Sequence, residues 1–153
     1  MNDIESLTLK INEILGRYVS IHDDIFKFSI RKLIPIPGIF KSINYHSHKT
    51  NLETLLTELS ELNSFLEENN THPNLVASDK EFLSVLHEYS IALLDTINRL
   101  YLIAEALCRK SEGSQDYSYD QYNSELAAYN LSVEQYTSLG ERLNALFSQR
   151  MRM

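Results

Sequence analysis

The chain has 153 residues, of which 43% are apolar and 23% are charged, and its formal net charge is −7. This length and composition predict one globular domain, and the acidic balance argues against a general nucleic-acid-binding protein, because phosphate contacts need a basic surface. No run approaches the ~20 apolar residues that span a bilayer, and a single cysteine excludes an internal disulfide framework.

The first predicted helix runs from about Asp3 to Leu33. Apolar residues recur along it in alternating steps of three and four, which places them on one helical face. A second apolar row (Leu15, Val19, Phe26 and Ile30) widens that face, so we expect the helix to pack against at least two neighbours. Pro35 disfavours helical geometry at Ile34 and should end the helix there. The first row comprises Ile4, Leu7, Ile11, Ile14, Tyr18, Ile21, Ile25 and Phe28.

The second predicted helix has two alternative starting points, near Gly38 or near Thr50. Its well-defined part is Asn51–Glu68, where leucines share one face. An early start would give four helices of about thirty residues, each about 45 Å long. It would also place His48 near the leucine face, whereas Ile43 would lie nearly opposite it.

The third predicted helix runs from Asp79 to about Lys110. Its apolar seam, the row of residues expected to face the core, comprises Phe82, Leu86, Tyr89, Leu93, Ile97, Leu100, Ala104 and Leu107. Ser78 followed by Glu81 matches a capping box, in which a serine hydroxyl and a glutamate side chain each bond a backbone amide of the first turn. Cys108 lies near the end of this helix and belongs to no motif that pairs it with a base. We therefore interpret it as a partly buried structural residue.

The fourth predicted helix runs from Tyr119 to about Gln149, and Ser118 with Gln121 forms a second capping-box match. Tyrosines recur on it every seven residues, on a face that also carries Leu126 and Val133. Tyrosine suits both cores and interfaces, and the neighbouring aliphatic residues favour a core. The stripe comprises Tyr122, Tyr129 and Tyr136.

Four long helices joined by short connections predict antiparallel neighbours. The expected fold class is therefore all-α, an antiparallel up-down-up-down four-helix bundle with long helices. The chain is expected to form a single helical-bundle domain over residues 1–153.

One segment differs in charge from the rest of the chain. This apolar-basic corner, Ile25–Leu52, holds five of the fourteen basic residues, none of the twenty-one acidic residues and two of the three prolines. Apolar side chains rimmed by cations are typical of protein-docking surfaces. We therefore predict that the corner binds another protein or a second copy of this chain. The expected contact residues are Arg31, Lys32, Ile36, Ile39, Phe40, Lys41 and Ile43.

Two other interpretations of the apolar-basic corner stay open. In the first, its apolar residues plug the end of the bundle core and its cations balance acidic neighbours. In the second, Lys27, Arg31, Lys32 and Lys41 meet anionic lipid while the apolar run IPIPGIF enters the interface, as in a peripheral membrane-surface protein.

Arg17 is followed by His22 after four intervening residues. The pair resembles the Arg-x(4–6)-His signature of the HEPN helical ribonucleases, whose bundles have a similar size. The likeness covers two residues, and the chain has Tyr18 where that family usually carries a polar residue. The resemblance implies that His22 would act as the acid/base and that Arg17 would hold phosphate.

Histidines at positions 46 and 48 could suggest a metal site with His22 and the Asp23-Asp24 pair. Residues two apart on a helix point to different sides, however, and the Glu-x-x-His pairs of di-iron bundles are missing from the chain. Glycine-rich phosphate loops, nucleophile elbows and zinc-ligand spacings are also missing. We predict no metal and no cofactor, and the sequence leads us to infer no small-molecule ligand.

The acidic exterior, the missing catalytic motifs and the apolar-basic corner together favour a non-enzymatic protein. We predict a helical protein-binding or adaptor protein that inhibits, chaperones or assembles with a partner protein. The acidic start MNDIES lacks the basic region of a secretory signal, so we expect a cytoplasmic protein.

Overall fold

The computed structural model describes residues 3–26, 44–69, 76–113 and 116–151, and these ranges contain four helices and no strand. The all-α four-helix prediction is therefore confirmed. The helices are 24 to 35 residues long, rather than about thirty each. They are α1 (Asp3–Phe26), α2 (Tyr45–Asn69), α3 (Ala77–Ser111) and α4 (Tyr119–Met151).

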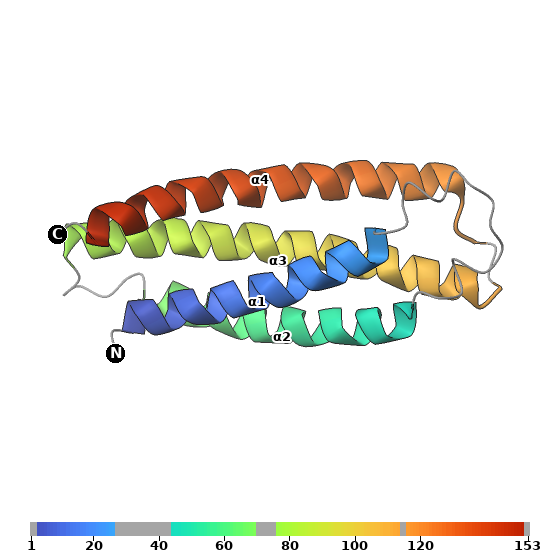
Figure 1. Ribbon diagram of the computed structural model, residues 1–153, viewed down its shortest axis with the longest axis horizontal. Coiled ribbons are helices and arrows are strands. Elements are labelled where there is room, and N and C mark those ends of the chain that lie inside the picture. Colours follow the sequence, from blue (N-terminus) through green and yellow to red (C-terminus); the bar gives the residue numbers. More distant parts are fainter. Residues whose placement is uncertain (1–2, 27–43, 70–75, 114–115, 152–153) are drawn as a thin grey trace.

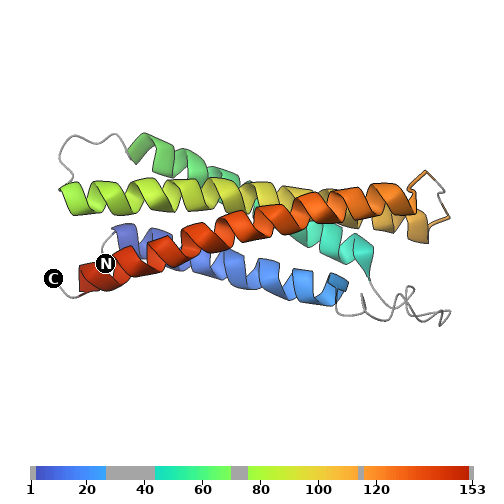
Figure 2. The ribbon, with the colours of Figure 1, turned by 90° about the horizontal axis from the view of Figure 1, so that it is seen from above.

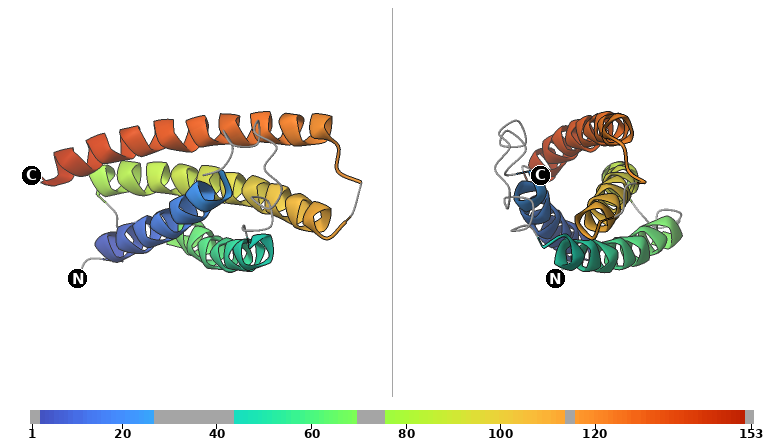
Figure 3. Two further views of the ribbon diagram at one scale, coloured as in Figure 1. Left: turned by 45° about the vertical axis from the view of Figure 1, so that its right-hand side comes forward. Right: turned by 90° about the vertical axis from the view of Figure 1, so that its right-hand side faces the viewer.

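Consecutive helices run in opposite directions and surround one core (Figures 1 and 2). The end-on view of Figure 3 shows the four helices grouped around that core. Helix α3 packs extensively against α2 and α4 and also contacts α1. Among the described helices, none has an apolar stretch that is long enough to cross a membrane.

The core is built from the apolar rows that the helical spacing predicts. The described members of the first α1 row are all buried, as are most seam residues of α2 and every seam residue of α3. Burying a side chain such as Leu93 or Ile97 contributes roughly 1.5–3 kcal/mol relative to leaving it in water. The second α1 row is only partly inside, since Val19 is 39% exposed while Leu15 and Phe26 pack against the core. The tyrosine stripe of α4 belongs to the core, with Tyr129 fully buried and Tyr122 and Tyr136 packed against it.

The start of α2 differs from both predicted positions. Asn44 precedes the helix, and its Oδ1 accepts a hydrogen bond from the amide of Ser47 at 3.0 Å. Asparagine is a favoured N-cap residue because its side chain satisfies an amide that the first turn leaves unpaired. The helix therefore begins at Tyr45, between Gly38 and Thr50. Residues 27–43, including the rest of the first predicted helix, lie outside the described residues.

One of the two predicted capping boxes is confirmed and the other is wrong. At α4 the amide of Gln121 donates to Ser118 Oγ at 3.1 Å, and the amide of Ser118 donates to Gln121 Oε1 at 2.9 Å. Helix α3 instead begins at Ala77 after Val76, which provides no side-chain cap, so Ser78 lies inside the helix rather than before it. Alanine propagates a helix well, and the amide of Lys80 already bonds the Val76 carbonyl at 3.0 Å.

Two helical glycines with different surroundings give a first prediction. A methyl group added at Gly16 would meet nothing within 4 Å, whereas one at Gly140 would lie 3.2 Å from Cε2 of Tyr89. Gly16→Ala should raise the free energy of unfolding by up to about 1 kcal/mol, because alanine favours a helix over glycine. Gly140→Val should lower it by about 1–3 kcal/mol, because the larger side chain overpacks the α3–α4 contact. Urea denaturation measures both values.

A Gly140→Val variant that is as stable as Gly16→Ala would contradict the close approach of α4 to the Tyr89 ring. Gly16→Ala serves as the matched control, because it also adds carbon to a glycine in the middle of a helix.

Candidate functional site

Two adjoining hollows lie along the seam between α1 and α2. Their volumes are about 440 Å³ and 640 Å³, and Glu13 and Arg17 line both of them. We call the two hollows together the α1–α2 groove. The first extends along α2 to Phe65, and the second extends in the other direction to Asp24 and His48, close to the apolar-basic corner.

The first hollow combines an apolar lining with charged edges. Leu7 and Ile14 of α1 and Leu62 and Phe65 of α2 supply the apolar part. Phe65 is 44% exposed although it is a large aromatic residue. Exposed aromatic side chains next to a hollow are typical anchor points for a partner molecule. The charged residues of this hollow are Lys10, Glu13, Arg17, Glu58 and Glu61.

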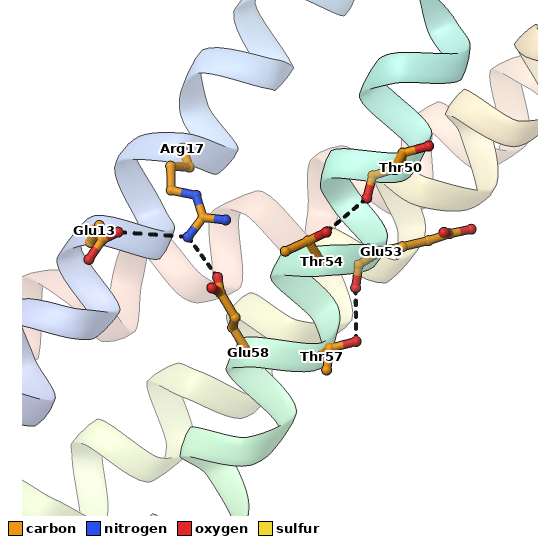
Figure 4. Close-up of polar contacts among 7 residues, drawn as sticks. All are labelled: Glu13, Arg17, Thr50, Glu53, Thr54, Thr57 and Glu58. Atoms are coloured by element: carbon orange, nitrogen blue, oxygen red, sulfur yellow. Dashed lines mark hydrogen bonds and ion pairs between the residues drawn. The ribbon is translucent and has the colours of Figure 1, made fainter.

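An ion pair bridges the groove in its middle. The Arg17 guanidinium donates to Glu58 Oε2 at 2.6 Å and lies 3.8 Å from Glu13 Oε1, so it connects α1 to α2 (Figure 4). Both partners of the inter-helix pair are about 40% exposed, with values of 40% and 44%. Pairs this exposed contribute at most about 1 kcal/mol to stability. The pair therefore fixes the position of two charged groups in the groove more than it stabilises the bundle.

The α2 surface beside Arg17 carries several threonines whose hydroxyls are engaged within their own helix. Thr54 Oγ1 donates to the Thr50 carbonyl at 3.2 Å, and Thr57 Oγ1 donates to the Glu53 carbonyl at 3.1 Å (Figure 4). Side chains that bond the carbonyl four residues earlier have one fewer donor available to a ligand. Charged groups, rather than these hydroxyls, therefore carry most of the polar recognition in the groove.

The end of the groove near the apolar-basic corner has its own charged contact. His48 Nε2 lies 3.8 Å from Asp24 Oδ2, so the last turn of α1 is close to the first turns of α2. The Nδ1 atom of His48 is buried and has no hydrogen-bond partner among the described residues. His46, the other histidine that we considered as a metal ligand, is exposed. Within the described ranges, no three His, Cys, Asp or Glu residues are grouped to hold a metal ion.

A second polar cluster lies inside the bundle, between α1 and α4. The hydroxyl of Tyr129 is hydrogen-bonded to the hydroxyl of Tyr18 and to Nδ1 of His22, the latter at 2.5 Å. The rings of His22, Phe26 and Tyr129 all contact one another, with centroid distances of 4.8 Å for His22–Phe26, 5.6 Å for His22–Tyr129 and 5.7 Å for Phe26–Tyr129. Tyr136 meets Tyr18 edge-on at 6.0 Å. These contacts attach α1 to α4 through hydrogen bonds as well as ring packing.

Burial favours the neutral form of every group in this Tyr18–His22–Tyr129 cluster. Desolvation raises the pKa of both tyrosine hydroxyls well above the ordinary value, so both stay protonated at neutral pH. Desolvation also lowers the pKa of His22, although the neighbouring Asp23 carboxylate acts in the opposite direction. The unprotonated nitrogen of a neutral imidazole can accept a hydrogen bond from a tyrosine hydroxyl, so the cluster is a chain of neutral donors and acceptors.

The structure separates the two residues that resemble the HEPN signature. Arg17 bonds Glu58 on α2, whereas His22 bonds Tyr129 on α4. Their functional groups therefore engage different neighbouring helices.

Cys108 is free and buried, as expected for a structural cysteine. Burial, followed by the Glu112 carboxylate, raises the pKa of its thiol. The Sγ atom lies 3.8 Å from Glu112 Oε1. A thiol with these surroundings is a poor nucleophile, because the thiolate is the reactive form.

All the contact residues predicted for the apolar-basic corner lie outside the described residues. They are Arg31, Lys32, Ile36, Ile39, Phe40, Lys41 and Ile43. The structure describes only the two ends of the corner, residues 25–26 and 44–52, and the second end contributes His48 and Asn51 to the lining of the groove. The groove itself was missed from sequence, because Arg17 and Glu58 are 41 residues apart and each looks like an ordinary solvated residue of an amphipathic helix.

Comparisons with protein-family models, with curated proteins and with solved structures find no significant match for this chain.

Proposed function

We propose that this protein is a non-enzymatic helical binding protein that holds a segment of a partner protein in the α1–α2 groove. The observation that carries the proposal is the half-exposed Phe65 in a hollow with an apolar lining and charged edges. The Arg17–Glu58 pair supports it, because it places a cation and an anion at fixed positions along the groove. The apolar-basic corner adjoins the groove and is proposed as a second contact with the same partner.

The charges of the groove favour a basic partner segment. Its acidic residues are Glu13, Asp24, Glu58 and Glu61, against the two cations Lys10 and Arg17. The whole chain also carries a net charge of −7. Complementary charge guides association and selects between partners.

A groove between two helices accepts an amphipathic helix, which presents apolar anchors at intervals of three and four residues. We therefore propose an amphipathic helix with lysine or arginine on its polar edges as the occupant. Its apolar anchors would contact Leu62 and Phe65, and its cations would contact Glu58 and Glu61.

The test is a binding titration with a labelled amphipathic peptide that carries leucines on one helical face and lysines on its edges. Fluorescence anisotropy should show saturable binding to the wild-type protein. Phe65→Asp should weaken it at least tenfold, because a central aromatic anchor is replaced by a charge. Leu131→Asp is the matched control, since Leu131 is an exposed apolar residue on α4 and lies outside the groove.

A second peptide with glutamates in place of the lysines tests the charge argument and should bind much more weakly. No saturable binding of the basic peptide, or equal binding to the wild type and to Phe65→Asp, would contradict the proposal. Circular dichroism of both variants shows whether helicity is retained.

Two alternatives from the sequence stay predictions. Contact with an anionic lipid surface depends on Lys27, Arg31, Lys32 and Lys41, which lie outside the described residues. RNA cleavage of the HEPN type would need Arg17 and His22 to act together, and these residues bond different helices.

A further inference from the structure

A separate aromatic pocket lies at one end of the bundle, where α2 begins, α3 ends and α4 begins. Its volume is about 450 Å³, which is within the range of small-molecule sites. Tyr45 of α2, Leu107 of α3 and Tyr122 of α4 contribute to its lining, with Tyr117 from the segment just before α4. None of its lining residues lines the α1–α2 groove.

The walls of the pocket are held in place by packing and by a hydrogen bond. The rings of Tyr117 and Tyr122 meet edge to face, with centroids 6.2 Å apart and an angle of 89°. The hydroxyl of Tyr117 donates to the Glu125 carboxylate. Fixed aromatic walls suit a flat ligand, because ring stacking does not require the walls to reorganise.

The hydroxyl of Tyr45 is the unusual group in this pocket. Tyr45 is 4% exposed, and its hydroxyl is buried with no hydrogen-bond partner in the described part of the chain. Burial raises the pKa of Tyr45 to about 12, with a smaller contribution from Tyr122, so the hydroxyl remains a donor at neutral pH. A buried donor without an acceptor is rare in proteins, because it loses its bond to water without replacement. A ligand oxygen would supply the missing acceptor.

The charge of the lining selects the ligand. Lys110 is the charged residue among the described lining residues, and it is exposed at the pocket. Tyrosine ring faces attract cations, but the Lys110 ammonium group beside them would repel a cationic ligand. We propose that this pocket binds a small aromatic carboxylate, whose ring packs on the tyrosine walls and whose carboxylate accepts hydrogen bonds from Tyr45 and Lys110.

Isothermal titration calorimetry with naphthalene carboxylate tests the proposal on the full chain. Saturable binding is expected for the wild type. Tyr45→Phe keeps the ring and removes only the donor, so it should weaken binding by about fivefold. Lys110→Gln should weaken it by a similar factor, whereas Lys80→Gln, the same change at an exposed lysine in the first turn of α3, should have no effect.

Two further ligands separate the outcomes. Naphthalene methanol, which lacks the charge, should bind the wild type more weakly than the carboxylate does. It should bind Lys110→Gln as tightly as it binds the wild type. Naphthyl trimethylammonium should not bind, and tighter binding of this cation than of the carboxylate would overturn the assignment. No saturable binding of the carboxylate, or unchanged binding by Tyr45→Phe, would also overturn it. Thermal melting should show Tyr45→Phe to be at least as stable as the wild type, because removing the Tyr45 hydroxyl breaks no hydrogen bond within the described chain.

Discussion

Tyr129→Ala is expected to lower the free energy of unfolding by about 3–5 kcal/mol, which is the usual cost of removing a large buried aromatic side chain. Tyr129 is fully buried and contacts Tyr18 and His22 across the α1–α4 boundary. The change would leave a cavity there and would remove the shared hydrogen-bond partner of two other residues. Urea denaturation followed by far-ultraviolet circular dichroism measures the change.

A milder substitution separates the ring from the hydroxyl. Tyr129→Phe keeps the packing but leaves the Tyr18 hydroxyl and His22 Nδ1 without their common partner, which should cost about 1–3 kcal/mol. Tyr119→Ala is the control on the same helix, since Tyr119 is largely exposed and its loss should change stability by less than about 0.5 kcal/mol. If Tyr129→Phe were as stable as the wild type, the hydrogen-bonded cluster would make no contribution to the fold.

Stability is expected to fall as the pH is lowered from about 7 towards 5, and His22 should account for part of this loss. The pKa of His22 is lowered in the folded protein, first by desolvation. At pH values between the folded pKa and the ordinary value of about 6.5, His22 therefore binds a proton in the unfolded chain but not in the native chain. Falling pH then favours the unfolded chain, so the stability contributed by neutral His22 is present above about 6.5 and is lost as the pH falls through the folded pKa.

Thermal melting at a series of pH values tests this dependence. His22→Gln keeps an acceptor for the Tyr129 hydroxyl but does not titrate, so its melting temperature should change less between pH 7 and 5 than that of the wild type. His46→Gln, the same change at an exposed histidine, should keep the full dependence. Equal pH dependence in the wild type and in His22→Gln would contradict this argument, because it would show that the pKa of His22 is the same in the folded and the unfolded chain.

Much of the fold followed from the spacing of apolar residues, because each helix must bury one face. The α3 seam from Phe82 to Leu107 and the described α1 seam from Ile4 to Ile25 are inside, as predicted. The ends were harder to place. The Ser118 box formed, whereas the equivalent pattern at Ser78 did not, because Ala77 allowed α3 to begin before the serine. Local patterns at a helix end compete with the propensity of the residues just outside them.

The candidate sites depended on relations between helices that no local pattern contains. Tyr129 was correctly predicted as a core residue from its stripe, yet its bonds to Tyr18 and His22 join positions more than a hundred residues apart. The buried hydroxyl of Tyr45 was equally hidden, since the pocket around it is assembled from three helix ends. The corner residues from Arg31 to Ile43, which carried the sequence-based docking prediction, lie outside the described residues and stay a prediction.

The central position of α3 has a consequence for how the native bundle opens. This helix carries fifteen buried residues and packs extensively against α2 and α4, whereas α1 packs less extensively against its neighbours. Backbone amides of α3 should therefore exchange with solvent deuterium only through global unfolding, while those of α1 should exchange sooner through a partial opening. A segment bound along the α1–α2 groove would slow exchange in α1 and α2 and leave the slowest amides of α3 unchanged.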